Sequence, residues 1–254
     1  MESIRKPFQG IGNIVRFNWH FYLLSIGFVV LILILNNYLN EKFSIYASIF
    51  CFLIVITTLI SLLVSYYVYD SSELYKLTWL DGIMQTETGK IININAGFDE
   101  TSILLKAKFP KAELIVMDFY DAKRHTEVSI KRARKAYPPY PNTQSIITSN
   151  IPLPDGCIDT IFVTLSAHEI RNDEERIVFF KELKRSLKQS GQIIVTEHLR
   201  DLSNFLAYNI GFFHFHSKSS WLNTFEKADL EIAKEIKITP FISTFILKKY
   251  GTTS

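Results

Sequence analysis

Thr160–Thr196 reads TIFVTLSAHEIRNDEERIVFFKELKRSLKQSGQIIVT, and this stretch decides the fold. Its two ends, Thr160–Leu165 and Gln192–Thr196, are short runs rich in β-branched residues, which favour strands. Between them, Asp173–Lys188 carries apolar residues at helical spacing and is predicted to be an amphipathic helix. A helix that joins two such strands is typical of an α/β protein with a parallel sheet.

Strand-like and helix-like segments alternate on both sides of this unit. The further predicted strands are Lys90–Asn95, Glu113–Asp118, Ser145–Thr148, Ile232–Ile238 and Ile242–Lys248, and the further predicted helices are Glu100–Lys108, Ala122–Ala136 and Trp221–Ala228. The last two strands flank a short turn and are expected to pair with each other. The whole pattern predicts a doubly wound, mainly parallel sheet.

Two long apolar runs precede this domain. Phe17–Leu39 has 17 hydrophobic residues of 23, Phe43–Tyr69 has 21 of 27, and neither contains Asp, Glu, Lys or Arg. Each run reaches the roughly 20 apolar residues that a membrane-spanning helix needs. Because only Glu41 and Lys42 carry charge between them, the runs predict a two-helix transmembrane hairpin. A buried helical hairpin of a soluble protein is the alternative.

The flanking charges predict an orientation. Arg5, Lys6 and Arg16 precede the first run, whereas Lys42 stands alone between the runs. Positively charged flanks stay in the cytoplasm, so both the tail and the C-terminal domain are expected on the cytoplasmic side of an inner or plasma membrane. The expected parts are a tail (1–16), the hairpin (17–69), a connector (70–89) and the domain (90–254).

The remaining global properties exclude other classes of protein. A net charge of +3 is too small to indicate a nucleic-acid partner. The two cysteines, Cys51 and Cys157, lie in different parts of the chain, so a disulfide is not expected. The sequence does not indicate an oligomeric state.

Three segments carry a family resemblance. Ile151–Asp159 (IPLPDGCID), Ser166–Ile170 (SAHEI) and Glu182–Gly191 (ELKRSLKQSG) resemble the segments around the fourth and fifth strands of class I S-adenosylmethionine-dependent methyltransferases. The resemblance covers about Lys90–Tyr250. It implies a Rossmann-like sheet of seven strands with an antiparallel final pair, and S-adenosylmethionine as cofactor.

The loop after the first strand departs from the family pattern. The family has an acidic residue and then Gly-x-Gly-x-Gly, and only Gly97 of the three glycines is present. Asn93 replaces the acid, while Asn95 and Asp99 replace two glycines. Asn and Asp tolerate left-handed backbone better than other residues with a side chain, so a turn is still expected here.

The resemblance implies a set of cofactor-binding residues. Asp118 would bind the ribose hydroxyls, with a plain turn or helix-capping role as the alternative. Phe119 or Tyr120 would stack on adenine, and Asn150 lies near the residue that binds the adenine amine. The full expected set is Asn93, Asn95, Gly97, Asp118, Phe119, Asn150 and Ser166.

Histidines and carboxylates follow the fourth and fifth strands, at the edge where ligands of such sheets bind. His168 and Glu169 are expected to assist the methyl acceptor, with histidine as a base near neutral pH. His198, beside Glu197, is a further catalytic candidate. The alternative for each histidine is a buried side chain satisfied by the backbone.

A metal is a competing use of the same groups. His168, Glu169, Glu197, His198, His214 and His216 could converge, but the sequence contains no HExxH motif and no cysteine-rich ligand spacing. We therefore expect no metal. Metal-dependent chemistry on the same fold remains a third hypothesis.

Two further segments suggest what the domain contacts. Phe205–Trp221 (FLAYNIGFFHFHSKSSW) is aromatic and apolar, which indicates either ordinary core packing or a pocket for a hydrophobic, lipid-like acceptor. The basic stretch Lys123–Lys135 is either a solvated face or a surface for anionic lipid headgroups.

The first hypothesis is a membrane-anchored methyltransferase that acts on a hydrophobic, lipid-like acceptor. The second is a non-catalytic scaffold or partner subunit with the same fold.

Overall fold

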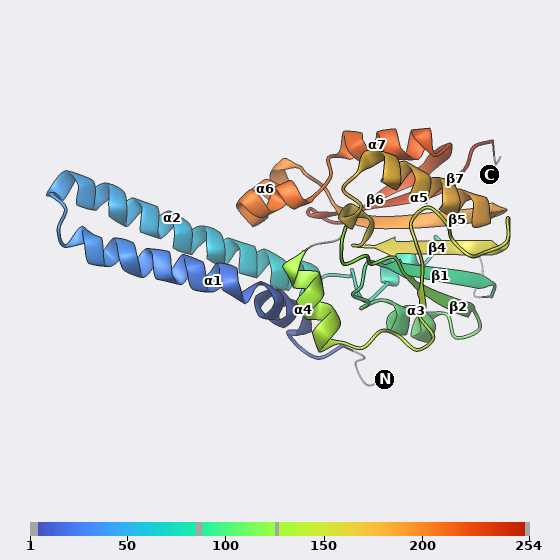
Figure 1. Cartoon of the computed structure of the whole chain (residues 1–254), viewed down its shortest axis with the longest axis horizontal. Coiled ribbons are helices and arrows are strands. Elements are labelled where there is room, and N and C mark those ends of the chain that lie inside the picture. The colour runs from blue at the N-terminus through green and yellow to red at the C-terminus, as the bar shows by residue number, and fades with distance from the viewer. Residues whose placement is uncertain (1–4, 85–87, 125–126, 252–254) are drawn as a thin grey trace.

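The computed structural model describes residues 5–84, 88–124 and 127–251. Figure 1 shows two long helices that project from a domain with helices on both sides of a sheet. The projecting helices are α1 (Gln9–Asn36) and α2 (Glu41–Tyr66). The helices of the domain are α3 (Ser102–Lys108), α4 (Val128–Ala136), α5 (Asp173–Ser186), α6 (Leu202–Tyr208) and α7 (Lys218–Lys227).

The described residues form one seven-stranded sheet with the order β3-β2-β1-β4-β5-β7-β6. Its strands are β1 (Lys90–Asn95), β2 (Glu113–Asp118), β3 (Gln144–Ser145), β4 (Ile158–Thr164), β5 (Leu187–His198), β6 (Leu230–Thr239) and β7 (Ile242–Lys249). The first five strands are parallel, and β7 is antiparallel to both β5 and β6. The predicted doubly wound sheet with an antiparallel final pair is confirmed.

The sheet has a hydrophobic core on each face. On one face, Phe180 of α5 and Trp221 of α7 pack with strand residues such as Val163. On the other face, Leu105 of α3 packs with Leu80 of the connector. Because both faces are covered, the central strands are apolar on both sides, as parallel strands require.

Several predicted boundaries differ from the structure. The helix expected from Ala122 begins at Val128, and the residues between them include 125 and 126, which lie outside the described residues. The helix expected to end at Lys188 ends at Ser186, because Leu187 already pairs with Ile158 in the sheet. Tertiary pairing here overrides the local helical pattern.

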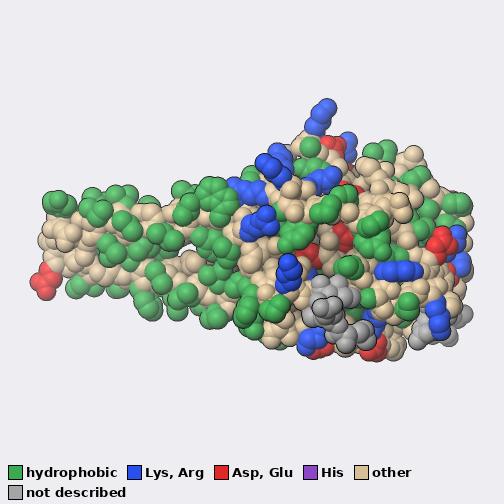
Figure 2. Space-filling view, turned by 90° about the horizontal axis from the view of Figure 1, so that it is seen from below, with side chains coloured by type: hydrophobic (Ala, Val, Ile, Leu, Met, Phe, Trp, Pro, Cys, Tyr) green, Lys and Arg blue, Asp and Glu red, His purple; other side chains and the backbone are tan. Residues whose placement is uncertain are grey.

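Both predicted apolar runs form long helices. An 18-residue window of α1 has a mean hydropathy of 2.0, such a window of the continuous helical segment from α2 through Ser71 has one of 2.7, and almost none of either window is buried in the protein. By length and composition both could cross a membrane. Figure 2 shows hydrophobic side chains over the hairpin and Lys and Arg side chains gathered where it meets the domain.

The first helix begins eight residues earlier than the apolar run that predicted it. Asp70 accepts hydrogen bonds from the backbone N–H groups of Gly10 and Ile11, each 2.7 Å long. This carboxylate satisfies two of the orphan donors that begin any helix and complements the helix dipole. The first two turns of α1 therefore pack on the domain, and α1 changes direction at Asn18, where the backbone leaves helical geometry.

Glu100 is the second attachment point of α1. Its carboxylate accepts hydrogen bonds from Arg5 (2.9 Å), Gln9 (3.3 Å), Asn13 (3.2 Å) and Tyr75 (3.0 Å). Glu100 stands directly after the loop that follows β1, so the N-terminal helix is fixed to that loop.

Arg176 of α5 is fully buried between α5 and α7. It donates to Thr224 (3.1 Å) and Ser220 (2.8 Å) of α7, and it forms an ion pair with Asp173 (2.6 Å). We expect Arg176→Met to lower the free energy of unfolding by about 2–4 kcal/mol, since it leaves buried partners unsatisfied. Chemical denaturation of the full chain in detergent measures this.

The matched control is Arg124→Met, because the Arg124 side chain is 61% exposed and its ion pairs lie at the surface. This change should alter stability by less than about 0.5 kcal/mol. Equal losses in the two variants would contradict a special role for the buried arginine.

Candidate functional site

The loop after β1 is tied to the start of α3. Asn93 Nδ2 donates to the hydroxyls of Thr101 (2.9 Å) and Ser102 (2.8 Å). Asp99 Oδ1 accepts from the backbone N–H groups of the same two residues, each at 2.9 Å. Asp99, which stands where the family has a glycine, therefore caps the first turn of α3.

Gly97 is the point of closest approach in this loop. Asn95 Oδ1 accepts from the Gly97 N–H at 3.0 Å, and Gly97 has φ +92°, a conformation that favours glycine. A Cβ atom at Gly97 would lie 2.8 Å from Arg134 Nη1 and 3.1 Å from Tyr120 Cβ. The space that the remaining glycine opens is thus filled by the Arg134 side chain.

Asp118 ends β2 and is the acid that the family resemblance assigns to ribose. One of its oxygens forms an ion pair with the Arg134 guanidinium, and the other accepts from the Tyr120 N–H at 2.8 Å. The guanidinium also lies over the Tyr120 ring, 4.5 Å from its centroid. Arg134, whose side chain is 40% exposed, thus forms an ion pair with the same carboxylate that a bound ribose would need.

The other predicted cofactor residues are placed differently. Phe119 is buried in the core and packs on Phe179 with ring centroids 5.3 Å apart. It presents no open face to a ligand, so the predicted stacking is left to Tyr120. Asn150 is exposed in the turn that follows β3. Ser166 is buried, and its hydroxyl donates to the Ile94 carbonyl at 3.0 Å.

α1 covers the same loop from outside. Phe17 packs edge-on against Phe98 and Tyr137, with ring centroids 5.6 Å and 6.2 Å apart. Arg132 of α4 donates to the Phe17 carbonyl at 2.5 Å and contacts His20. The loop, α4 and the base of the hairpin thus form one connected unit.

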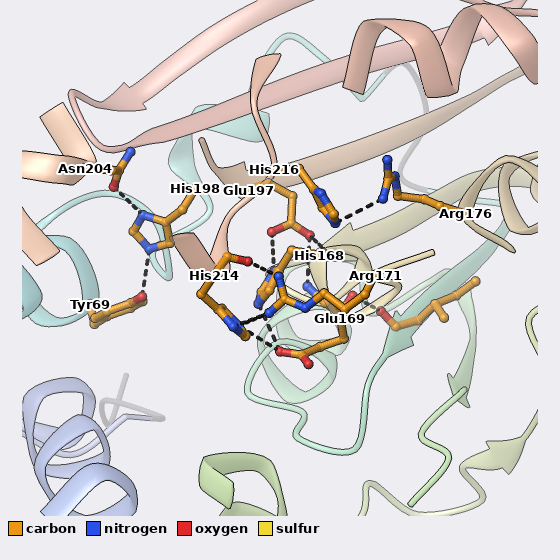
Figure 3. A network of polar contacts seen from close by, with 12 residues as sticks. Tyr69, His168, Glu169, Arg171, Arg176, Glu197, His198, Asn204, His214 and His216 are labelled. Atoms are coloured by element: carbon orange, nitrogen blue, oxygen red, sulfur yellow. Dashed lines mark hydrogen bonds and ion pairs between the residues drawn. The ribbon is translucent and has the colours of Figure 1, made fainter. Parts of the chain in front are cut away.

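The structure brings four of the predicted polar residues together beyond β4 and β5 (Figure 3). His168 Nδ1 lies 2.6 Å from Glu197 Oε2, and His168 Nε2 lies 3.2 Å from Glu169 Oε1. Glu197 also accepts from the backbone N–H of Ser166 at 3.1 Å. His214 Nε2 approaches the same Glu169 oxygen at 3.1 Å. We name His168, Glu169, Glu197 and His214 the histidine–carboxylate cluster.

Electrostatics in this cluster favour charge on His168. Burial lowers the pKa of His168, but the charges of Glu197 and Glu169 and their hydrogen bonds outweigh it and raise the pKa to about 10. Burial likewise opposes ionisation of Glu169, and hydrogen bonds from His168 and His214 hold the pKa of Glu169 well below its usual range. His168 therefore carries its proton at neutral pH in this arrangement and donates hydrogen bonds. This differs from the base that the sequence suggested.

His198 lies apart from this cluster and links the end of the helical hairpin, at Tyr69, to the sheet. Its Nε2 is 2.8 Å from the Tyr69 hydroxyl, and its Nδ1 is 2.9 Å from Asn204 Oδ1. The ring stacks on Phe215 with centroids 4.7 Å apart. With both nitrogens engaged and the side chain buried, His198 serves to position Tyr69 and Asn204.

A cavity of about 640 Å³ opens beside the cluster. Its wall is mostly polar, with one exposed aromatic ring, that of Phe213. The lining residues are Glu127, Arg171, Asp173, Arg200, Phe213, His214, His216, Ser217 and Ser220. His216, predicted as a possible ligand, lies 3.0 Å from Arg176 and away from Glu169.

Sequence reasoning missed three contributors to this region. Arg134 lies in a basic stretch whose charges all look alike in sequence, so nothing marked it as the partner of Asp118. Tyr69 is the last residue of the second apolar run, where an aromatic residue is typical of the end of a membrane span, so its contact with His198 was not predicted. Glu127, which lies 3.2 Å from His214 Nδ1, carries no sequence signal.

The comparisons with known proteins concern the fold and one central segment of the chain. A family described as methyltransferase domain matches residues 98–195. A "SAM dependent methyltransferase from Aquifex aeolicus" has a similar fold, with a TM-score of 0.52 and 17% identity over 70% of this chain and 93% of that one. Residues 98–195 are thus similar to the methyltransferase-domain family, and the chain has the fold of the class I methyltransferases.

Two further solved structures were matched. A putative type 11 methyltransferase from Sulfolobus solfataricus has 17% identity and a TM-score of 0.46, covering 72% of this chain and 94% of that one. A SAM-dependent methyltransferase from Methanosarcina mazei has 15% identity and a TM-score of 0.47, covering 68% and 97%. No curated protein matches the chain.

His198 makes the stability of the domain depend on pH. Burial lowers the pKa of His198 to about 4, so the unfolded chain binds its proton more readily than the folded protein does. The free energy of unfolding is therefore not reduced by His198 above pH 6.5, the pKa of the unfolded chain. As the pH falls from 6.5 to about 4, protonation of this group in the unfolded chain lowers the free energy of unfolding by roughly 3 kcal/mol in total. We expect His198→Gln to make the fall in stability across this window shallower.

Denaturation midpoints of the full chain in detergent at several pH values measure this effect. His20→Gln, at the base of the hairpin, is the control and should keep the wild-type slope. A wild-type slope in His198→Gln would contradict the assignment.

Proposed function

We propose that this protein is a membrane-anchored methyltransferase that uses S-adenosylmethionine to methylate an amphiphilic acceptor with an apolar body and a polar reacting end. The observation that carries the proposal is the position of Asp118, Gly97 and Tyr120 together at the carboxyl ends of β1 and β2, within a methyltransferase domain. Ligands of doubly wound sheets bind at this edge.

The residues at this edge fit the cofactor in kind. Asp118 offers a carboxylate for two ribose hydroxyls, Tyr120 offers a ring for adenine, and Gly97 lets backbone come close to a ligand. When bound, S-adenosylmethionine supplies an electrophilic methyl group. The chain must first withdraw Arg134 from Asp118, and the 40% exposure of this side chain leaves it room to turn into solvent.

The acceptor side is argued from exposed apolar residues. α6 packs on α2, and together with the turn η4 (Asn209–His214) it exposes side chains that lie between the hairpin and the cavity. The strongly exposed ones are Leu202, Phe205, Leu206, Ile210 and Phe213. Such a contiguous apolar surface marks a membrane or ligand contact. It offers a path from a bilayer to the cavity at Phe213.

The polar end of the cavity suits the reacting group of the acceptor. His168 and Glu169 hold hydrogen-bonding atoms next to His214, which lines the cavity. Positioning the acceptor in line with the methyl group supplies much of the rate in such a transfer. Glu197 holds the His168 ring in place from behind.

A non-catalytic scaffold is the second candidate, and the Arg134–Asp118 pair favours it. In that case the ion pair is a permanent structural contact, and α4 and α1 close the cofactor edge. Cofactor binding separates the two candidates.

We expect Asp118→Ala to weaken binding of S-adenosylhomocysteine by about tenfold or more, a loss of about 1.4 kcal/mol. Arg134→Ala should tighten binding several-fold, because a competing ion pair reduces the fraction of binding-competent protein. Isothermal titration of the full chain in detergent measures both. Lys131→Ala, an exposed lysine of the same helix, should bind like the wild type.

If the folded wild type and Arg134→Ala both fail to bind at millimolar ligand, the scaffold reading replaces the methyltransferase. If the wild type and the three variants all bind S-adenosylhomocysteine equally well, the predicted binding of ribose by Asp118 is wrong.

The acceptor class is tested by transfer of a radiolabelled methyl group from S-adenosylmethionine to a total membrane lipid extract. Label should enter the organic-extractable fraction, and Phe213→Ser should reduce this transfer at unchanged cofactor affinity. Val178→Ser, which removes a similarly exposed apolar side chain from α5, is the control. Label that stays in the aqueous phase would exclude a lipophilic acceptor.

A further inference from the structure

The histidine–carboxylate cluster has the donor set and the geometry of a metal site. Among the residues that the structure describes, His168, Glu169 and His214 each offer one ligand atom, and these atoms lie within 4.8 Å of one another. Both histidines direct Nε2 at the same oxygen, Glu169 Oε1, at 3.2 Å and 3.1 Å. We propose that this cluster binds a divalent transition-metal ion, with Zn²⁺ as the preferred cation.

The two measured separations suit zinc. Zinc lies about 2.0–2.2 Å from histidine nitrogen and carboxylate oxygen, so two tetrahedral ligands are about 3.3 Å apart. The His168–Glu169 and His214–Glu169 pairs have this spacing already. The third separation, between the ligand nitrogens of His168 and His214, shortens to the same value when the His214 side chain rotates. This side chain is 27% exposed, so it has room to turn.

The outer contacts orient both rings for this purpose. Glu197, fully buried, lies 2.6 Å from His168 Nδ1, and Glu127 lies 3.2 Å from His214 Nδ1. A carboxylate on the far nitrogen of a metal-binding histidine fixes its tautomer and leaves the other nitrogen as the ligand. Here the same arrangement occurs twice, on two histidines from different segments.

The charge balance also calls for a divalent cation. Glu127, Glu169 and Glu197 contribute three negative charges, and Arg171, 3.9 Å from Glu127, contributes one positive charge. A bound metal would displace the proton that His168 carries in its absence; with both histidines then neutral, the group carries −2, which one divalent cation neutralises. The Arg171 guanidinium also lies 3.1 Å from His214 Nε2. For a metal to bind at this nitrogen, the guanidinium must move away from it and toward Glu127.

The donor types select among metals. Two imidazoles and one carboxylate suit Zn²⁺ or Fe²⁺, whereas Mg²⁺ prefers oxygen ligands. Three protein ligands leave a coordination position open, as in catalytic rather than structural zinc sites. His214, Glu127 and Arg171 all line the cavity, so this position faces the space where a polar ligand would enter. The metal site does not depend on the proposed methyl transfer.

The test is metal binding by the full chain in detergent, after chelator treatment and without cofactor or acceptor. Titration with ZnSO₄ should show one ion per chain, and Co²⁺ should give the visible absorption bands of a four- or five-coordinate site. Millimolar Mg²⁺ should not compete. Separate titration with S-adenosylhomocysteine reports on the proposed function, so the failure of either proposal is visible independently.

Variants assign the ligands. Glu169→Gln and His214→Ala should each weaken Zn²⁺ binding by about 100-fold or more, and Glu197→Gln by about 10–100-fold. Glu174→Gln, an exposed acid at the start of α5, should bind like the wild type. Thermal unfolding shows whether each variant is folded. If a variant is not folded, the Co²⁺ spectrum of the wild-type protein still tests the proposal.

Two results would overturn the proposal. One is a folded wild-type protein that binds neither Zn²⁺ nor Co²⁺ at a one-to-one ratio. The other is one-to-one binding that persists unchanged in both Glu169→Gln and His214→Ala.

Discussion

The attachment of α1 to the domain is the constraint on which the rest of the structure depends. Two carboxylates hold it: Asp70 caps the helix at Gly10 and Ile11, and Glu100 accepts four hydrogen bonds, two of them from side chains of α1. Carboxylate bonds of this kind are stronger than neutral ones. They fix the base of an otherwise exposed hairpin against the edge of the sheet where ligands bind.

This attachment gives a physical reason for the altered loop after β1. In a glycine-rich loop the backbone alone faces the ligand, whereas here Phe98 packs on Phe17 and Asp99 caps α3. The side chains that replace glycine have structural partners. The same loop therefore contacts α1 through Phe98 and carries Gly97 next to Asp118 and Arg134.

The sequence was sufficient for most of the sheet, because strands such as β1 and β4 are short runs rich in β-branched residues and the helix of residues 173–186 has a clear amphipathic stripe. It also placed Asp118 and the His168–Glu169 pair at the edge of the sheet where they lie, since polar residues after parallel strands meet at one edge, while their roles stay predictions. Phe119 could not be placed, because a side chain after a strand can face either the core or the ligand. Arg134 could not be identified, because only the packing of α4 selects one arginine from a basic stretch.

The two halves of the site have opposite electrostatic character. At Asp118 a single carboxylate is neutralised by Arg134. In the histidine–carboxylate cluster, two buried carboxylates surround one histidine, and burial makes each uncompensated charge costly. The first half is neutralised by an arginine, whereas the second is compensated by the proton that His168 carries, which a bound cation would displace.

The contact of Phe98 and Glu100 with α1 has an evolutionary consequence. Residues at the start of α1 and residues in the loop after β1 share one set of contacts, so they should change together among relatives. A relative that has lost the hairpin would be released from this constraint, and its loop would be free to regain the glycines. A relative that keeps Glu100 should keep a hydrogen-bond donor at the position of Asn13.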